Sequence, residues 1–279
     1  MIKNNFISIR RFAFLYKKDF IENWKTMLLR FVMLYAIMAI IFCFIGYSEF
    51  ESRIKHDNEL WYGDIYYLRP AIFLFWGFGC LFASLMIEKM KSKTKRIAYL
   101  MTPATTFEKF FSRFLLVVVV FIIAFFLAFK LADYTKMAIF SIRYPELNIA
   151  PINISQGLCS QKPDAMTNNW MEFTALFSVY IFFQSLFVLG STLWYKNPFI
   201  KTLAAGVAIT LLFYAVDGLL VHSLFNDNQL RFSVGDYCGE LMKKWITKQN
   251  LFLLFSLLTL FNWVISYFRF KDSEIINRL

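Results

Sequence analysis

Cysteine and histidine are scarce in this chain of 279 residues, which has four Cys and two His. The cysteines are scattered and form neither a CxxC pair nor a Cys/His cluster. The sequence therefore predicts no structural metal site and no disulfide-rich scaffold. His56 and His222 lie far apart in the sequence and outside any HExxH pattern, so a zinc hydrolase is not indicated either.

Motifs for phosphate binding and covalent catalysis are also absent. The chain has no GxxxxGK[ST] loop, which excludes ATP binding by that route. Serines and carboxylates are present, yet no nucleophile, base and orienting group can be assembled from their spacing. We therefore expect no catalytic residue, no cofactor and no enzymatic activity in this chain, and we disfavour an intramembrane enzyme.

Charged residues make up only 18% of the chain, whereas 58% is hydrophobic and 20% is aromatic. This composition excludes a soluble catalytic domain and is typical of an all-α membrane protein that crosses the bilayer several times. Six apolar runs are each near the roughly 20 residues that a bilayer core requires. They are 27–47, 70–90, 114–132, 173–195, 199–221 and 251–268.

The positive charge has a strongly uneven distribution between these runs. If 1–30, 88–113, 195–201 and 269–279 are cytoplasmic, they hold 19 of the 30 Lys and Arg but 6 of the 19 acids. The cytoplasmic side then has a net charge of +13 and the outer side −2. Such a bias fixes the orientation of a membrane protein and places both termini in the cytoplasm. Membrane topology explains the basic excess, so no nucleic-acid partner is indicated.

The first 26 residues lack the apolar core of a cleavable signal peptide. They are instead amphipathic, because one helical face carries only hydrophobic side chains while Arg11, Lys18 and Lys25 repeat on the opposite face. We predict a helix over 1–26 that lies in the inner headgroup plane and binds lipid, followed by a six-helix domain over 27–268 and a cytoplasmic tail, 269–279. The alternative is a cytoplasmic helix packed on the protein's own loops. The apolar face consists of Ile2, Phe6, Ile9, Ala13, Tyr16, Phe20 and Trp24.

The cytoplasmic loop 89–113 joins the second and third apolar runs and is the longest basic interruption in the chain. Arg96 to Met101 can form a short helix, which Pro103 stops. Thr105 and Glu108 match the capping box, in which each residue bonds the backbone of the other and a new helix begins. We therefore predict an ordered loop that leads directly into the third span.

Three outer loops, 48–69, 133–172 and 222–250, are the sizeable polar segments of the opposite side, and we expect them to be ordered. Cys159 and Cys238 lie in the second and third of these loops, on the side where an oxidising environment favours disulfides. A Cys159–Cys238 bridge and two free thiols both remain open, because the sequence does not supply the distance between the two Cα atoms.

Polar residues within the predicted spans are few. Gln184 either bonds a neighbouring helix or lines a polar path, and Asn262 and Lys130 are the other interior candidates. Asp217 is about 19 residues beyond the Pro198 turn, which places it at the outer interface or against a substrate. Small residues at 204–206 and 208 allow the fifth span to approach another helix closely, within the chain or in a second subunit.

Two segments resemble parts of bacterial type-2 permeases of ATP-binding-cassette exporters. The run 100–113, LMTPATTFEKFFSR, is similar to the LPAS…EKFLSR segment after the second span of that family, although Thr102 replaces the usual Leu before the proline. Residues 190–191 and 195–203 resemble its short cytoplasmic turn between spans four and five. The layout of an amphipathic helix, six spans and internal termini also agrees over nearly the whole chain.

This resemblance implies a permease subunit in a bacterial plasma (inner) membrane, which pairs with a second permease as a homodimer or heterodimer. Two cytoplasmic ATP-binding-cassette ATPase subunits would bind it and contact the coupling loop 89–113. The residues that carry this expectation are Arg96, Pro103, Thr105, Glu108, Lys109 and Arg113. The alternative function is a non-transporting membrane scaffold or a sensory or assembly partner, in which the loop only sets orientation.

Overall fold

The computed structural model describes residues 8–55, 64–88, 93–145, 149–160, 165–194, 196–224 and 247–276. These residues form helices joined by turns, and the β-structure among them is one isolated bridge between Cys159 and Thr167. The all-helical class predicted from composition is thus confirmed for the part of the chain that the structure describes.

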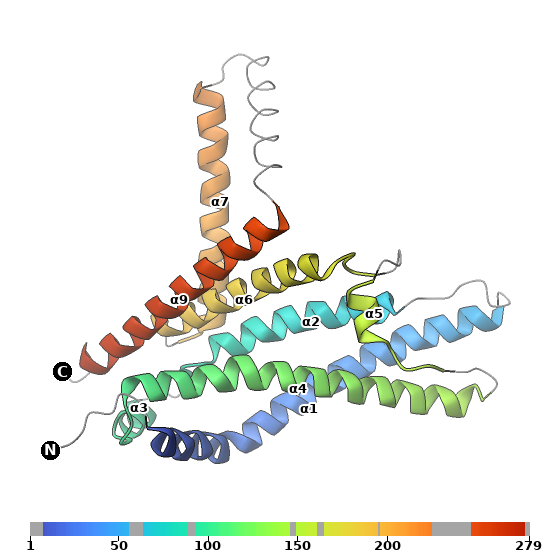
Figure 1. Ribbon diagram of the computed structural model, residues 1–279, viewed down its shortest axis with the longest axis horizontal. Helices are drawn as coiled ribbons and strands as arrows, with labels where there is room; N and C mark the ends of the chain where they lie inside the picture. Colours follow the sequence, from blue (N-terminus) through green and yellow to red (C-terminus); the bar gives the residue numbers. More distant parts are fainter. Residues whose placement is uncertain are drawn as a thin grey trace. The chain divides into compact units, whose positions relative to one another are not determined.

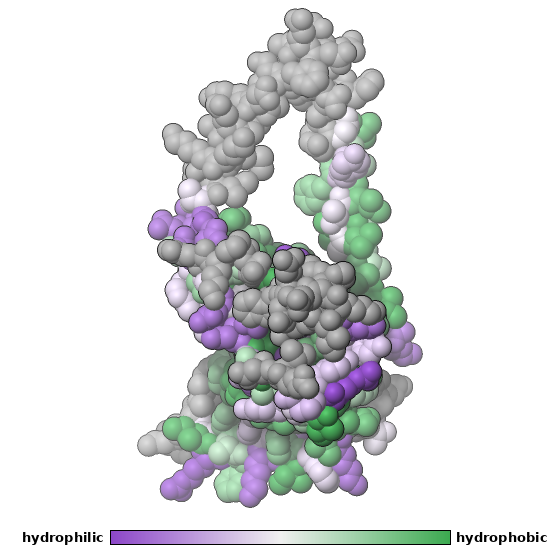
Figure 2. Space-filling model, turned by 90° about the vertical axis from the view of Figure 1, so that its right-hand side faces the viewer, coloured by the Kyte–Doolittle hydropathy of each residue, from purple (hydrophilic) through white to green (hydrophobic). Residues whose placement is uncertain are grey.

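Six helices in the described ranges are long and apolar enough to cross a membrane. Large hydrophobic side chains, such as Phe73 and Phe44, are 84% and 75% exposed on them, and Figure 2 shows hydrophobic residues reaching much of the described surface. A surface of this kind is stable in lipid and unfavourable in water. The chain is therefore a multi-pass membrane protein. The six helices are α1 (Ile9–Lys55), α2 (Ile65–Ser84), α4 (Thr106–Arg143), α6 (Trp170–Leu193), α7 (Pro198–Leu224) and α9 (Lys248–Ile276).

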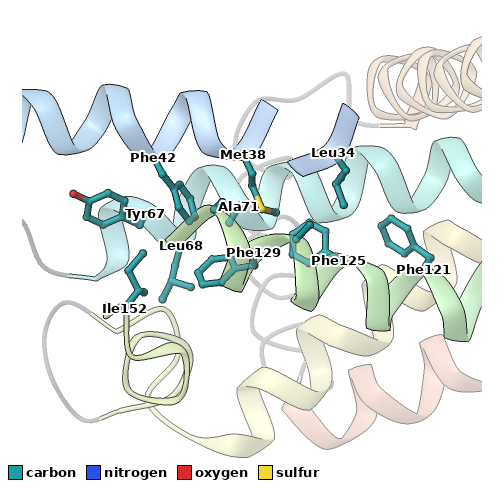
Figure 3. Close-up of a cluster of buried hydrophobic side chains, with 12 residues drawn as sticks. Leu34, Met38, Phe42, Tyr67, Leu68, Ala71, Phe121, Phe125, Phe129 and Ile152 are labelled. Atoms are coloured by element: carbon teal, nitrogen blue, oxygen red, sulfur yellow. The ribbon is translucent and has the colours of Figure 1, made fainter. Parts of the chain in front are cut away.

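The chain divides into two compact units, of which the first combines Met1–Phe82 with Ala98–Phe173. Its core is a cluster of buried side chains between α1, α2 and α4 (Figure 3). The ring of Phe42 packs edge-on against Tyr67 of α2 and Phe129 of α4, with centroids 5.6 and 5.2 Å away. Such aromatic pairs add to the packing that holds the three helices together.

Helices α1 and α4 run in the same direction, since contacts between them follow the same order along both (Figure 1). The 47 residues of α1 span about 70 Å at 1.5 Å per residue, which is more than twice a bilayer core of about 30 Å. The helix has no break near Met27, where the sequence predicted a separate segment to end. The placement of residues 9–26 in the headgroup plane stays a prediction.

Helices occupy much of the two segments predicted as outer loops, 48–69 and 133–172, and the position of these segments outside the membrane stays a prediction. Helix α1 continues to Lys55 and α4 to Arg143, and the short α5 (Ile154–Leu158) follows. Phe50 stacks near Phe140 with ring centroids 4.9 Å apart, so tertiary contacts stabilise both extensions beyond the apolar runs. Most of the third predicted loop, 222–250, lies outside the described residues.

The second unit contains α6 beyond Phe173, α7 and α9. Phe187 of α6 stacks on Phe199 of α7 with centroids 5.3 Å apart, and Gly190 faces Thr202 so closely that a Cβ atom would clash. The turn between α6 and α7 includes Asn197 with a φ of 51°, a conformation that asparagine tolerates better than most residues. The predicted short turn after the fourth span is therefore confirmed.

Candidate functional site

The corner between α2 and α4 contains the short helix predicted from the sequence. Helix α3 (Lys93–Leu100) covers most of the predicted piece and begins three residues before Arg96. The chain then turns through Pro103 before α4 begins, with the N–H of Ala104 bonded to the carbonyl of Thr102 at 2.8 Å. The sequence predictions of a short helix and of a stop near Pro103 are confirmed.

The predicted capping box at the start of α4 is also confirmed. Thr105 has extended backbone angles, and its hydroxyl accepts the N–H of Glu108 at 3.3 Å. In return, the Thr105 N–H donates to Oε2 of Glu108 at 3.0 Å. Two backbone donors at the helix start thereby find acceptors, which fixes where α4 begins.

Glu108 also binds the beginning of α1. Nε of Arg11 donates to Oε2 at 2.7 Å and Nη2 to Oε1 at 2.8 Å, while the backbone N–H of Ser8 donates to Oε1 at 2.9 Å. The Glu108 side chain is fully buried and that of Arg11 is 37% exposed. Bidentate guanidinium–carboxylate pairs are among the strongest and most directional side-chain contacts. One carboxylate therefore joins the start of α4 to the start of α1.

A second charged contact joins the same two helices about two turns further along α1. Asp19 accepts a hydrogen bond from Nη2 of Arg113 at 3.1 Å and another from Oγ of Ser112 at 3.2 Å. The Asp19 side chain is 1% exposed and that of Arg113 is 14% exposed. Because both buried acids of this region have basic partners, the two helices are held in one register.

Arg113 also connects this contact to α3. Its guanidinium lies over the ring of Tyr99, 5.4 Å from the centroid, and the Tyr99 hydroxyl donates to the carbonyl of Lys109 at 3.0 Å. The end of α3, the start of α4 and the start of α1 therefore form one connected structure. We call it the clamp, defined by Arg11, Asp19, Tyr99, Thr105, Glu108, Ser112 and Arg113.

The structure places the predicted coupling residues in different environments. Thr105, Glu108 and Arg113 belong to the clamp, and Lys109 is also buried, at 4% exposure. The predicted direct contact of Glu108, Lys109 and Arg113 with a partner is not supported by these positions, because their side chains face the protein's own helices. Arg96 is half-buried and Pro103 is exposed.

Sequence reasoning missed the roles of Arg11 and Asp19. The sequence predicts Arg11 on the basic face of an amphipathic helix, toward anionic lipid or a cytoplasmic partner, yet its guanidinium binds Glu108 of α4. The order of charges in the sequence could have indicated these pairs. In α1 the basic Arg11 precedes the acidic Asp19, whereas in α4 the acidic Glu108 precedes the basic Arg113. Two helices that run in the same direction can pair such opposite sequences of charge.

The side of α1 turned away from the clamp is apolar. Ile9, Phe14, Phe20 and Trp24 are exposed, at 84%, 73%, 47% and 49%. Three of these residues belong to the hydrophobic face predicted from the sequence. An exposed hydrophobic face beside basic residues is suited to the boundary between lipid headgroups and acyl chains.

Among the described residues, no group of three or more His, Cys, Asp or Glu side chains is placed to hold a metal ion. The two carboxylates of the clamp accept hydrogen bonds from basic, hydroxyl and backbone groups. The clamp therefore holds the starts of α1 and α4 in fixed positions relative to each other.

The predicted outer disulfide receives no structural support. Cys159 is half-buried and carries a free thiol. Its predicted partner, Cys238, lies outside the described residues. The pairing therefore stays a prediction.

Comparisons with known proteins identify no relative: no protein family, curated protein or solved structure matches the chain. The class that the fold defines is a multi-pass helical membrane protein, in which buried ion pairs join the starts of α1 and α4. Any more specific function is inferred from the chemistry and geometry of the clamp.

Proposed function

We propose that this chain is the permease subunit of an ATP-driven exporter and couples a separate cytoplasmic ATPase to the movement of a substrate across the membrane. The observation that carries the proposal is the clamp, in which Glu108 and Asp19 fix the coupling loop to two membrane helices. The resemblance of residues 100–113 to type-2 permeases supports the same function.

The proposed mechanism depends on a rigid connection of α3 to both α4 and α1. A displacement applied at α3 reaches α4 through Tyr99, Lys109 and Arg113, and reaches α1 through Glu108 and Asp19. Both helices continue from this corner into the apolar runs that cross the bilayer. A push by a partner therefore tilts or shifts two spans together, and so changes the balance between two helix arrangements.

We assign the direct contacts with the ATPase to Arg96, which is half-buried, and to Pro103, which is exposed. The buried residues of the clamp transmit the displacement. Residues 9–26 would rest on the inner leaflet through their exposed apolar face, with Lys18 and Lys25 toward anionic headgroups. A second permease, identical or different, would complete the transporter.

The proposed topology has both termini in the cytoplasm of a bacterial plasma membrane. Single cysteines placed at 48–69, 133–172 or 222–250 should react with a membrane-impermeant maleimide added to intact cells. Single cysteines at 91–95 should react only after the cells are opened, because the basic corner is retained inside. Labelling at 91–95 in intact cells would contradict the six-span orientation.

The proposed coupling predicts that some variants lose ATP-dependent export but still bind the ATPase, whereas others lose ATPase binding. Arg113→Gln should leave membrane insertion and ATPase copurification intact but reduce ATP-dependent export by about tenfold, because the buried Asp19 loses its charged partner. Arg96→Glu should instead reduce copurification itself, because the change reverses the charge of a half-buried residue that the proposal assigns to the ATPase contact.

The matched control for these variants is Lys18→Gln, which removes an exposed basic residue of α1 whose ion pair is with Glu22 of the same helix. Export and copurification should be unchanged in that control. An ATPase that binds and drives transport normally in Arg113→Gln would exclude the coupling role of the clamp. Absence of any ATPase partner would favour the scaffold function.

A further inference from the structure

Gln184 is a buried polar residue in α6 whose amide has no hydrogen-bond partner in the described part of the chain. Its side chain is 1% exposed, and both Nε2 and Oε1 are unpaired. Tyr180 and Val188, four residues away on either side, are equally buried, so all three belong to one interior face of the helix. The amide is enclosed among these interior residues.

An unpaired amide is unfavourable in this environment. A buried donor or acceptor without a partner costs about 1–3 kcal/mol, and the side chain of Gln184 carries both kinds of group. At 1.5 Å per residue, the residue lies about 13 Å from the Leu193 end of a helix that is about 35 Å long, well inside the hydrocarbon region. Leucine or methionine would fill the same space without this cost.

Polar but uncharged residues lie next to Gln184 in α6 and on the buried side of α9. The next residue, Ser185, accepts a hydrogen bond from Nδ2 of Asn262 in α9 at 2.9 Å. Thr259 and Ser266 lie on the same buried side of α9 and donate to carbonyls of their own helix. The sequence has no Asp, Glu, Lys or Arg at 173–193 or 249–268. A charged ligand would find no countercharge within these two segments, whereas a neutral amide or hydroxyl would find both hydrogen-bond functions on Gln184.

We propose that Gln184 is a binding residue for the neutral hydrogen-bonding group of an amphipathic cargo, such as the amide or hydroxyl headgroup of an acyl or alkyl chain. This inference rests on the proposed transport function and specifies the class of substrate. The amide is unpaired among the described residues, and a cargo that supplies a donor and an acceptor compensates the cost. The apolar helices around it accommodate the hydrocarbon part of the cargo.

The proposal is tested on the purified full-length chain in phosphatidylcholine nanodiscs, without any ATPase. Two photoactivatable probes with the same ten-carbon chain and diazirine are compared, one ending in an acetamide and one in a methyl group. The acetamide probe should label the α6 peptide that contains Gln184 about fivefold more than the alkane probe, the ratio expected for one net hydrogen bond. A probe that ends in a quaternary ammonium group should show no enrichment.

The variant Gln184→Met keeps the length of the side chain but removes the amide, and should abolish the enrichment. Ser178→Ala is the matched control on the same helix, because the Ser178 hydroxyl donates to the carbonyl of Ala175 within α6 and is not available to a ligand. Gln184→Leu, with thermal unfolding measured in parallel, separates lost binding from lost folding.

Unchanged enrichment in a folded Gln184→Met or Gln184→Leu variant would overturn the proposal, as would equal labelling by the acetamide and alkane probes. Either result would assign the amide to helix packing or to a bound water. Failure of ATPase copurification leaves this experiment unaffected, so the cargo site and the coupling function can fail separately.

Discussion

Replacing Lys136 by methionine is expected to destabilise the first unit by about 3–5 kcal/mol, the usual effect of removing one partner of a buried ion pair. Nζ of Lys136 lies 2.9 Å from Oδ1 of Asp133, and the two side chains are 4% and 1% exposed. Without the ammonium group, the Asp133 carboxylate would remain buried with its charge uncompensated. Thermal unfolding of the purified protein in nanodiscs measures the loss.

The size of this effect follows from what else contacts Lys136. Its ammonium group lies 4.3 Å from the centroid of the Tyr67 ring, and the Tyr67 hydroxyl donates to Glu49 of α1. The pair thereby connects the end of α1 and the start of α2 to the later part of α4. Methionine fills a similar volume, so the destabilisation measures lost electrostatics more than lost packing.

The double variant Lys136→Met, Asp133→Asn should recover most of the stability, because it leaves no buried charge at the pair. Oδ2 of Asp133 accepts the N–H of Ile152 at 3.0 Å, and the asparagine carbonyl can accept the same bond. A double variant as unstable as the single one would show that the ammonium group contributes through Tyr67 and not through Asp133.

The matched control is Lys18→Met in the exposed pair with Glu22, whose charged atoms are 3.7 Å apart and whose side chains are 49% and 45% exposed. Exposed pairs of this kind contribute less than about 0.5 kcal/mol on a helix, so the unfolding temperature should barely change. A similar loss in both variants would mean that the buried position of Lys136 is unimportant.

Glu108→Gln is expected to release the beginning of α1 from α4 and to reduce ATP-dependent export. Glutamine keeps the size of the side chain, but its single carbonyl cannot serve Arg11, Ser8 and Thr105 at once. Its NH2 group would also face the guanidinium donors. Hydrogen exchange at the Ser8 amide should accelerate by roughly tenfold, as expected when a hydrogen bond to a charged acceptor is lost.

Thr105→Ala separates the two functions of Glu108. This change removes the hydroxyl that caps α4 but leaves the carboxylate available to Arg11. It should destabilise the start of α4 by about 1 kcal/mol, leave the protection of Ser8 nearly unchanged and have a smaller effect on export. Equal exchange at Ser8 in both variants would show that the capping box, not the Arg11 pair, anchors α1.

Local sequence chemistry was sufficient for several elements of this protein. The capping box of Thr105 and Glu108, the stop at Pro103 and the short helix before it depend on residues a few positions apart, so sequence spacing determines them. The number of apolar runs likewise determined the number of helices that can cross a membrane. Each of these predictions needed only backbone hydrogen bonding and hydropathy.

The ends of α1 and α4 and the partners of the buried charges were decided by tertiary structure. Asp133 and Lys136 were assigned to a loop because charged residues after an apolar run usually face water, whereas contacts with α1, α2 and Ile152 keep them helical and buried. Likewise, Glu108 and Arg11 are 97 positions apart, and nothing local in the sequence pairs them.

The amino-acid sequence by itself thus determined the membrane class, the six apolar helices and the capped start of α4, because burial in lipid and helix capping are local properties of the chain. Only the tertiary structure decided which charges are enclosed and which remain exposed. The physical reason is that the stability of a buried charge depends on partners brought close by folding, and helix packing brings Arg11 to Glu108 and Asp19 to Arg113 across nearly a hundred residues.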